Sequence, residues 1–478
     1  MLQLFRAKLI VHEAYGQILE KSVGACRAAG LMKRRKLEAA VDTTPILGRG
    51  AVKDTHNLVS DAIRRVVVEA CALKHWDREV VVAEQGLGRH FGSSFRGAVE
   101  LDWSDPDARR ALVDQLVADA RVVLELAKSA LHGYAGDPEG TSKLREAHDL
   151  LADVLQQDID EVPEDGGGPQ IRRGTARDRI VSTTDPEMRH GHKSHSKGFE
   201  GYKASVVVET ESGVILAVDT QPANAPDREG AKELVAEAVE RSGQELERVL
   251  GDTAYGDSET RRELTSLGAE VIAKAPPGTR RGYYGLRDFW IDPRRGVARC
   301  PAGKRSIRRD RGKGEDPGWR YIFSRRDCGP CALRTQCTKS RVAARIVQAT
   351  ERMRELQRLR RRQRTKRFQQ CYRRRVVAEH ALARMVRRGL WQARYFGRVR
   401  VTFQTALIGA VANLSLAAGV CALRPFCQAR HGVGAALTVL RLIIQSLCAT
   451  LQVQPALSPE PLPPTFGWLE TAPSRPGL

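Results

Sequence analysis

Three carboxylates are the residues of this sequence whose types and positions could carry out chemistry together. Asp42 ends the apolar run LEAAV, Asp252 follows the apolar run RVLG, and Glu379 lies in the helical stretch CYRRRVVAEHALARM. Converging carboxylate oxygens are ligands for divalent metals, and two Mg²⁺ ions held in this way can activate one oxygen and stabilise the leaving oxygen in phosphoryl transfer. The alternative is helix caps and surface ion pairs, because the chain has 57 Asp and Glu residues.

Two further residues share a helix face with Glu379. Tyr372, Arg375 and Glu379 are three and four residues apart, which places an aromatic ring, a phosphate-binding guanidinium and a carboxylate on one side of a helix. Twelve of the 24 residues from 352 to 375 are Lys or Arg. A run of one charge sign favours nucleic-acid binding over a solvated helix with internal ion pairs.

Four cysteines form another candidate site, at Cys300, Cys328, Cys331 and Cys337. The C-x2-C spacing of Cys328 and Cys331 is typical of zinc ligands, and the other two could complete a four-sulfur site. One Zn²⁺ held in this way would be structural, because protein sulfurs would fill all four positions. The alternative is reduced cysteines that pack or lie exposed.

Composition and charge limit the class of protein. Lys and Arg number 78, the net charge is +21, and a chain this basic is expected to bind a polyanion, nucleic acid first. The 42% apolar content indicates a globular core and excludes collagen-like, wholly disordered and multi-span membrane chains. Sparse cysteines and no signal-peptide pattern at the N-terminus predict a cytoplasmic protein. Asn413 and Ser415 make the apolar stretch 406–423 a predicted buried helix, with no membrane partner.

The elements that must position the candidate residues alternate as in an α/β protein. Residues 37–46 predict a buried strand that delivers Asp42 at its end, and 55–160 show helical periodicity that a Gly/Pro-rich stretch, 162–174, ends. Later segments predict a hairpin over 202–221, a helix over 231–243, a strand within 248–257 that ends at Asp252, a helix over 258–268 and a strand over 269–277.

Several segments, taken together, resemble the DDE transposases of bacterial insertion sequences. They are LEAAVDTTPILGRGAVKDT, RIVSTTDPEMRHGHKSHSKGFEGYKASVVVE, VLGDTAYGDSETRREL, the stretch from Cys300 to Cys337, and YRRRVVAEHALA. The resemblance implies an RNase H-like mixed sheet flanked by helices, with two Mg²⁺ or Mn²⁺ ions on Asp42, Asp252 and Glu379. Tyr372, Arg375 and Glu379 fit the family's Y-x2-R-x3-E signature.

The function that this resemblance implies is DNA transposition. Such enzymes cut double-stranded DNA at the terminal inverted repeats of their element and join the freed 3′-hydroxyl to target DNA, and we expect a homodimer assembled on DNA. Tyr372, Arg375, Arg384 and Arg387 are the expected DNA-binding residues. Arg384 and Arg387 flank Val386, where the family signature has a lysine. Asp185 is the rival for the first aspartate, but it lies in a Ser/Thr/Pro-flanked turn instead of following an apolar strand.

Two alternatives to this function remain. Relatives carry a helical DNA-binding region before the part that matches residues 1–40, and we expect it to be missing here. The chain could therefore be a truncated, inactive DNA-binding remnant. A general nuclease on the same fold is the other alternative.

The domain organisation follows from the same patterns. The predicted parts are a remnant of a helical N-terminal region (1–36), an RNase H-like core (37–54 and 175–277), a helical insertion (55–174), a Cys-rich insertion (278–350), a basic helical region completing the core (351–423), and an apolar segment with a Pro-rich disordered tail (424–478).

Overall fold

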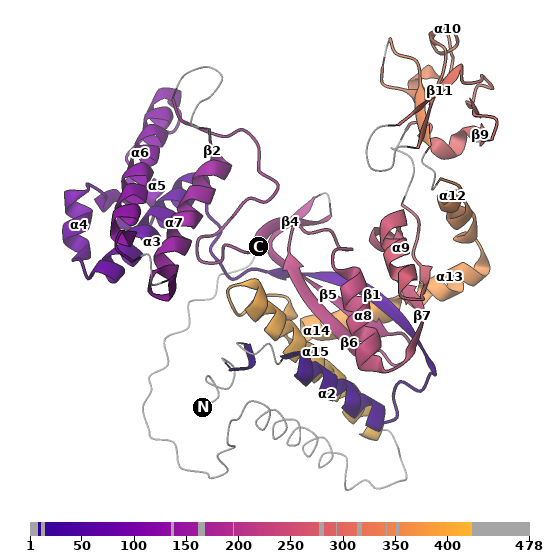
Figure 1. Ribbon diagram of the computed structural model, residues 1–478, viewed down its shortest axis with the longest axis horizontal. Helices are drawn as coiled ribbons and strands as arrows, with labels where there is room; N and C mark the ends of the chain where they lie inside the picture. Colours follow the sequence, from indigo (N-terminus) through magenta and orange to yellow (C-terminus); the bar gives the residue numbers. More distant parts are fainter. Residues whose placement is uncertain are drawn as a thin grey trace. The chain divides into compact units, whose positions relative to one another are not determined.

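The structure is a computed structural model (Figure 1). The residues it describes are 8–10, 15–134, 138–160, 168–194, 196–276, 282–292, 294–312, 318–340, 342–349 and 353–422. The predicted apolar segment and tail at 424–478 lie outside these residues.

A six-stranded mixed sheet is the centre of the fold. Its strands are β1 (Lys36–Leu47), β4 (Arg189–Ser194), β5 (Lys197–Glu209), β6 (Ile215–Pro222), β7 (Glu245–Leu250) and β8 (Glu270–Ile272). β5 pairs antiparallel with β1 on one side and with β6 and β4 on the other. β7 pairs in parallel with β1, and β8 pairs in parallel with β7. The predicted mixed α/β sheet is confirmed, and this strand order is consistent with an RNase H-like fold.

Helices cover both faces of the sheet because side chains of β1 alternate between them. Leu37, Ala39 and Val41 share a core with α8 (Ala231–Ser242) and α9 (Ser258–Ser266). Ala40 and Ile46 point the other way, into a core with α14 (Val376–Met385). Asp42 has the parity of Ala40, so it belongs to the face that α14 covers.

The most apolar helix, α15 (Arg398–Ala422), belongs to this core. Within the described residues it is the one helix whose length and hydropathy would suit a membrane span, and half of that window is buried. It packs against β6 and α2 (Tyr15–Ala28). The buried Asn413 side chain accepts from Ile215 N and donates to Ile215 O, both at 2.8 Å, and so pairs with the edge of β6. The predicted buried helix is confirmed for the part that is described.

A helical segment follows β1. Its elements are α3 (Thr55–Lys74), α4 (Arg78–Glu84), η1 (Gly88–Phe91), α5 (Phe95–Ala98), α6 (Pro106–Leu131) and α7 (Pro138–Asp158), with a short pair of strands, β2 (Ile159–Asp160) and β3 (Gln170–Ile171). Apolar residues at helical spacing, such as Leu112, Leu116 and Val123, form a core separate from those of the sheet. Asp105 caps α6 by accepting from Asp107 N at 2.9 Å, as a residue before Pro106 is expected to do.

The predicted elements after the loop at 162–174 are present, with different ends. The hairpin is β5 and β6, and the two helices are α8 and α9. The strand predicted to end at Asp252 ends at Leu250, and Asp252 instead caps a 3-10 turn, η2 (Thr253–Gly256). The last strand, β8, is three residues long.

Small elements occupy the segment between β8 and the basic helices. They are η3 (Leu286–Asp288), β9 (Trp290–Asp292), β10 (Val297–Arg299), β11 (Arg308–Arg311), β12 (Trp319–Ile322), α10 (Arg325–Cys328), α11 (Arg334–Cys337) and β13 (Ile346–Ala349). β9 pairs with β10, and β11, β12 and β13 form a second sheet. The chain returns through α12 (Met353–Arg362) and α13 (Lys366–Arg373) to α14, and a π-helical turn, η4 (Val386–Leu390), leads to α15.

Candidate active site

The register of the parallel strands β1 and β7 places Asp42 and Asp252 side by side on one face of the sheet. The last paired residues of β1 and β7 are Ala40 and Leu250. Asp42 and Asp252 each lie two residues further along the chain, on the face of the sheet that α14 covers. Asp252 is fixed there by its role as the cap of η2, since its Oδ1 accepts from Ala254 N at 2.8 Å. The two carboxylates therefore come from neighbouring parallel strands.

The strand that carries Asp42 does not end at Asp42, so this prediction is wrong. Pairing of β1 with β7 stops at Ala40, but the antiparallel pairing with β5 continues to Leu47. Pro45 interrupts the apolar pattern without ending the strand, because proline is tolerated where a strand has lost one of its two neighbours. Asp42 is thus held in a paired strand, opposite Val206.

Glu379 reaches the same site from α14, and Arg375 joins it to Asp42. Arg375 Nη1 donates to Asp42 Oδ2 at 2.8 Å, and Nη2 donates to Oε1 of Glu379 one turn along the helix. The Asp42 side chain is 16% exposed and that of Glu379 is 49% exposed. One guanidinium therefore supplies the positive charge between two carboxylates.

The electrostatics agree with a clustered carboxylate site. Burial raises the pKa of Asp42; hydrogen bonding from Thr43 N and the charge of Arg375 lower it, whereas Asp252 and Glu379 raise it further. Burial lowers the pKa of Arg375, but Asp42 and Glu379 outweigh this and hold it above the usual value. The site thus favours a bound cation, and Arg375 is the cation present.

Tyr372 lies near Asp42 and Asp252, and Lys274 contacts the Tyr372 ring. The Tyr372 ring stacks on Phe368, with centroids 5.8 Å apart, and Lys274 Nζ lies 4.7 Å from its centroid. Lys274 is two residues past Ile272, the partner of Leu250, so Asp252 and Lys274 continue adjacent strands on the same face. Sequence reasoning missed Lys274. The same strand-end rule that selected Asp252 could have found it, because Lys274 follows the next apolar strand, Glu270–Ile272.

A buried carboxylate anchors the helices that carry this site. Glu38, on β1, is fully buried and accepts from Arg374 Nη1 at 2.9 Å, Arg248 Nη1 at 3.2 Å and Thr210 Oγ1 at 3.0 Å. Because Arg374 precedes Arg375 at the junction of α13 and α14, this contact fixes the start of the helix that presents Glu379.

The other two arginines predicted to bind DNA, Arg384 and Arg387, lie away from the carboxylates. Arg384 donates from Nη2 to Gly213 O at 2.6 Å, in the turn between β5 and β6, and burial lowers its pKa. Arg387 is exposed on η4. Neither of these arginines bonds Asp42, Asp252 or Glu379.

Asp185, the rival for the first aspartate, is buried in the core. It is 0% exposed, and its Oδ1 accepts from Tyr202 OH at 2.5 Å and from Gly397 N at 3.1 Å. Those partners connect β5 to the start of α15. This carboxylate therefore holds elements together and is separate from Asp252 and Glu379.

A Ser-His-Asp arrangement in the helical segment is also buried. His90 contacts Ser60 Oγ at 2.9 Å through Nδ1 and Asp119 Oδ2 at 2.8 Å through Nε2. Ser60 and His90 are 0% exposed, so a substrate has no access to the hydroxyl. The arrangement is a hydrogen-bonded link between α3, η1 and α6.

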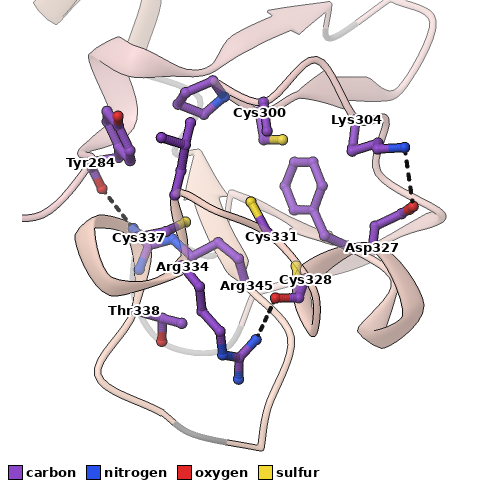
Figure 2. A pocket seen from close by; sticks show the side chains of 14 residues that line it. Tyr284, Cys300, Lys304, Asp327, Cys328, Cys331, Arg334, Cys337, Thr338 and Arg345 are labelled. Carbon is purple, nitrogen blue, oxygen red and sulfur yellow. Dashed lines mark hydrogen bonds and ion pairs between the residues drawn. The ribbon is translucent and has the colours of Figure 1, made fainter.

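The four cysteines line one pocket in the segment between β8 and α12 (Figure 2). In the described part of the chain, the structure holds no group of three or more His, Cys, Asp or Glu side chains that are close enough together to bind a metal ion. This applies to the cysteines and to the three carboxylates alike.

The order and mixed pairing of the strands, with helices on both faces, are those of a protein of the RNase H-like class. A family model described as the transposase DDE domain matches residues 170–414, just over half of the 478 residues, so the chain belongs to this family of transposases. The match includes Asp252 and Glu379, whereas Asp42 precedes it. No curated protein and no solved structure matches the chain. Members of the family act on DNA in transposition and recombination and generally use divalent metal ions.

Proposed function

We propose that the chain is an insertion-sequence transposase that cuts double-stranded DNA at the terminal inverted repeats of its element and transfers the freed strand to target DNA. The observation that supports the proposal is that Arg375 bonds both Asp42 and Glu379, while Asp252 follows the strand parallel to that of Asp42 and is near enough to raise its pKa. We further propose that the enzyme works in the cytoplasm, as a homodimer assembled on the DNA ends.

The metal that we propose is Mg²⁺ or Mn²⁺, as two ions, held by Asp42, Asp252 and Glu379. The donor set fits these ions, because all three ligands are carboxylates and hard cations prefer oxygen. When bound, the ions would supply Lewis-acid activation of the attacking oxygen and stabilise the leaving oxygen.

In this mechanism the Arg375 guanidinium can bind either the two carboxylates or a DNA phosphate. Without a metal it neutralises Asp42 and Glu379. A bound divalent ion would neutralise the two carboxylates in place of Arg375, and the guanidinium would then be available to a DNA phosphate, which suits its planar fork of donors. We therefore propose that Arg375 changes its hydrogen-bond partners from the carboxylates to a DNA phosphate when DNA binds.

Tyr372 and Lys274 position the DNA backbone. The Lys274 ammonium lies over the Tyr372 ring, and both are next to the strand end that carries Asp252. A cation and an aromatic platform in this position can hold a phosphate and stack against a base or sugar, which fixes the scissile bond relative to the carboxylates.

The test is cleavage of a labelled duplex that carries the terminal repeat of the element, with Mg²⁺ or Mn²⁺. We expect the full chain to cut at the repeat, Glu379→Gln to lose at least 100-fold in rate, and EDTA to abolish cutting. The control is His380→Gln, an exposed neighbour on the same helix, which should cut normally.

Two outcomes would overturn the proposal. Salt-dependent DNA binding without cutting under either metal would make the chain a non-catalytic DNA-binding protein. Cutting at random positions, with no preference for the repeat, would make it a general nuclease.

A further inference from the structure

The four cysteines come from separate short elements and meet at one place. Cys300 follows β10, Cys328 ends α10, Cys331 lies in the turn after it, and Cys337 ends α11. All four line one cavity of about 30 Å³, and Figure 2 shows their side chains around it. A space of this size is enough for one small occupant.

Tight turns present two of the sulfurs. Gly303 N donates to Cys300 O at 2.8 Å, and Cys300 N donates to Lys304 O at 2.9 Å, which closes a loop with Cys300 at its start. Gly303 has φ +78°, a left-handed conformation that favours glycine. Arg334 N donates to Cys331 O at 3.0 Å and closes a similar turn. The backbone therefore fixes where these cysteines stand, and rotation about χ1 sets the final position of each sulfur.

The apolar core of this segment is too small to stabilise it well. Among the described residues its buried core comprises Phe289, Ala298, Tyr321, Phe323, Val347 and Ala349. A core of this size in a segment that spans about 70 residues calls for an additional cross-link, because small domains bury too little surface to offset the entropy of folding. Cys300, Cys328 and Cys337 pack against this core, at its edge.

The charges around the cavity suit a thiolate cluster. Four thiolates and one Zn²⁺ carry a net charge of −2, and Arg334, Arg345 and Lys304 line the same cavity, where Lys304 pairs with Asp327 at 3.7 Å. Arg345 Nε is buried and has no hydrogen-bond partner, so it is an unsatisfied donor. The cations that line the cavity would therefore balance the charge of a zinc-bound thiolate cluster.

We propose that Cys300, Cys328, Cys331 and Cys337 bind one structural Zn²⁺ ion that cross-links the segment from 282 to 349. The ends of this segment are already joined to each other outside it, since Ala275 N donates to Gln363 Oε1 at 3.1 Å and Arg360 Nη2 donates to Pro276 O at 3.0 Å. Zinc therefore stabilises the segment itself, and the sheet remains folded when the ion is removed.

The first experiment measures metal in the full chain. We expect one zinc per chain by elemental analysis, and after replacement by Co²⁺ an absorption spectrum with the strong sulfur-to-cobalt charge transfer of a four-thiolate tetrahedral site. Cys328→Ser with Cys331→Ser should lose the zinc. Cys371→Ser, a half-buried cysteine on α13, should retain it.

The second experiment separates the site from a general loss of folding. Chelation of the zinc should open the segment 282–349 to limited proteolysis while the fragments of the sheet remain resistant. A metal-free chain that resists proteolysis as well as the purified protein does would overturn the proposal. A Co²⁺ spectrum without charge-transfer bands would also overturn it. Alkylation of fewer than the ten cysteines in denaturant without reductant would do the same, because it would show disulfides.

Discussion

Arg375 donates a hydrogen bond to Asp42 at 2.8 Å across 333 positions of the chain. The guanidinium also bonds Glu379, so it occupies the place where a metal would neutralise both carboxylates. The charge balance of the site therefore depends on one arginine at the start of α14.

Arg375→Gln should strengthen divalent metal binding. Removing the internal cation leaves Asp42 and Glu379 without a competitor for the metal, and we expect Mn²⁺ to bind about tenfold more tightly, a gain of about 1.4 kcal/mol. Calorimetric titration of the full chain with Mn²⁺ measures this. The control is Arg373→Gln, an exposed neighbour, and weaker Mn²⁺ binding by Arg375→Gln would contradict the prediction.

The raised pKa of Asp42 makes metal binding and stability depend on pH in opposite senses. Because the folded state holds this proton more tightly than the unfolded chain does, the contribution of Asp42 to stability is present at low pH. It is lost as the pH rises from the ordinary carboxyl value through the raised one. Metal binding needs the carboxylate, so Mn²⁺ affinity should fall as the pH drops through the raised pKa.

Glu379→Gln tests the part of this pKa shift that comes from neighbouring charge. Without the negative charge of Glu379, the pKa of Asp42 should fall, and the midpoint of Mn²⁺ binding against pH should move to lower pH. Titrations at a series of pH values give the midpoint even though the affinity of the variant is lower. A midpoint that stays in place would show that Glu379 does not act on Asp42.

Lys274→Gln should weaken DNA binding uniformly across sequences. If its ammonium binds one phosphate, the slope of log K against log salt concentration should fall by about one unit. Binding of a labelled duplex at several salt concentrations measures the slope. Lys232→Gln, on α8 at the opposite face of the sheet, is the matched control and should leave the slope unchanged.

Glu38→Gln should destabilise the fold by about 2–3 kcal/mol, because it leaves Arg248 and Arg374 without their buried carboxylate. Urea unfolding measures the change. Lys36→Gln, on the same strand as Glu38, breaks the exposed pair with Glu245 of β7 and should cost less than about 0.5 kcal/mol. Equal losses in the two variants would mean that burial of Glu38 does not matter.

The site could be predicted in part from the sequence because parallel strands carry their chemistry at their ends. Asp252 follows a short apolar run, and the spacing of Tyr372, Arg375 and Glu379 gives one helix face. Lys274 obeys the same rule but was missed, because the strand predicted over 269–277 includes Lys274, whereas β8 ends at Ile272 and leaves Lys274 after the strand. Arg384 is predicted to bind DNA because it lies beside Val386, the position of the signature lysine, whereas in the structure its guanidinium donates to Gly213 O.

The sequence by itself determined residue types and local periodicity: the mixed α/β class, the basic helices, the two aspartates that follow apolar runs, and the four cysteines. The tertiary structure decided which of them meet. The register of β1 with β7 aligns Asp42 with Asp252, and the packing of α14 places Arg375 between Asp42 and Glu379. The tertiary structure also buries Asp185 and the Ser60–His90 pair away from solvent. These outcomes depend on contacts between residues far apart in the chain, and local sequence patterns do not predict such contacts.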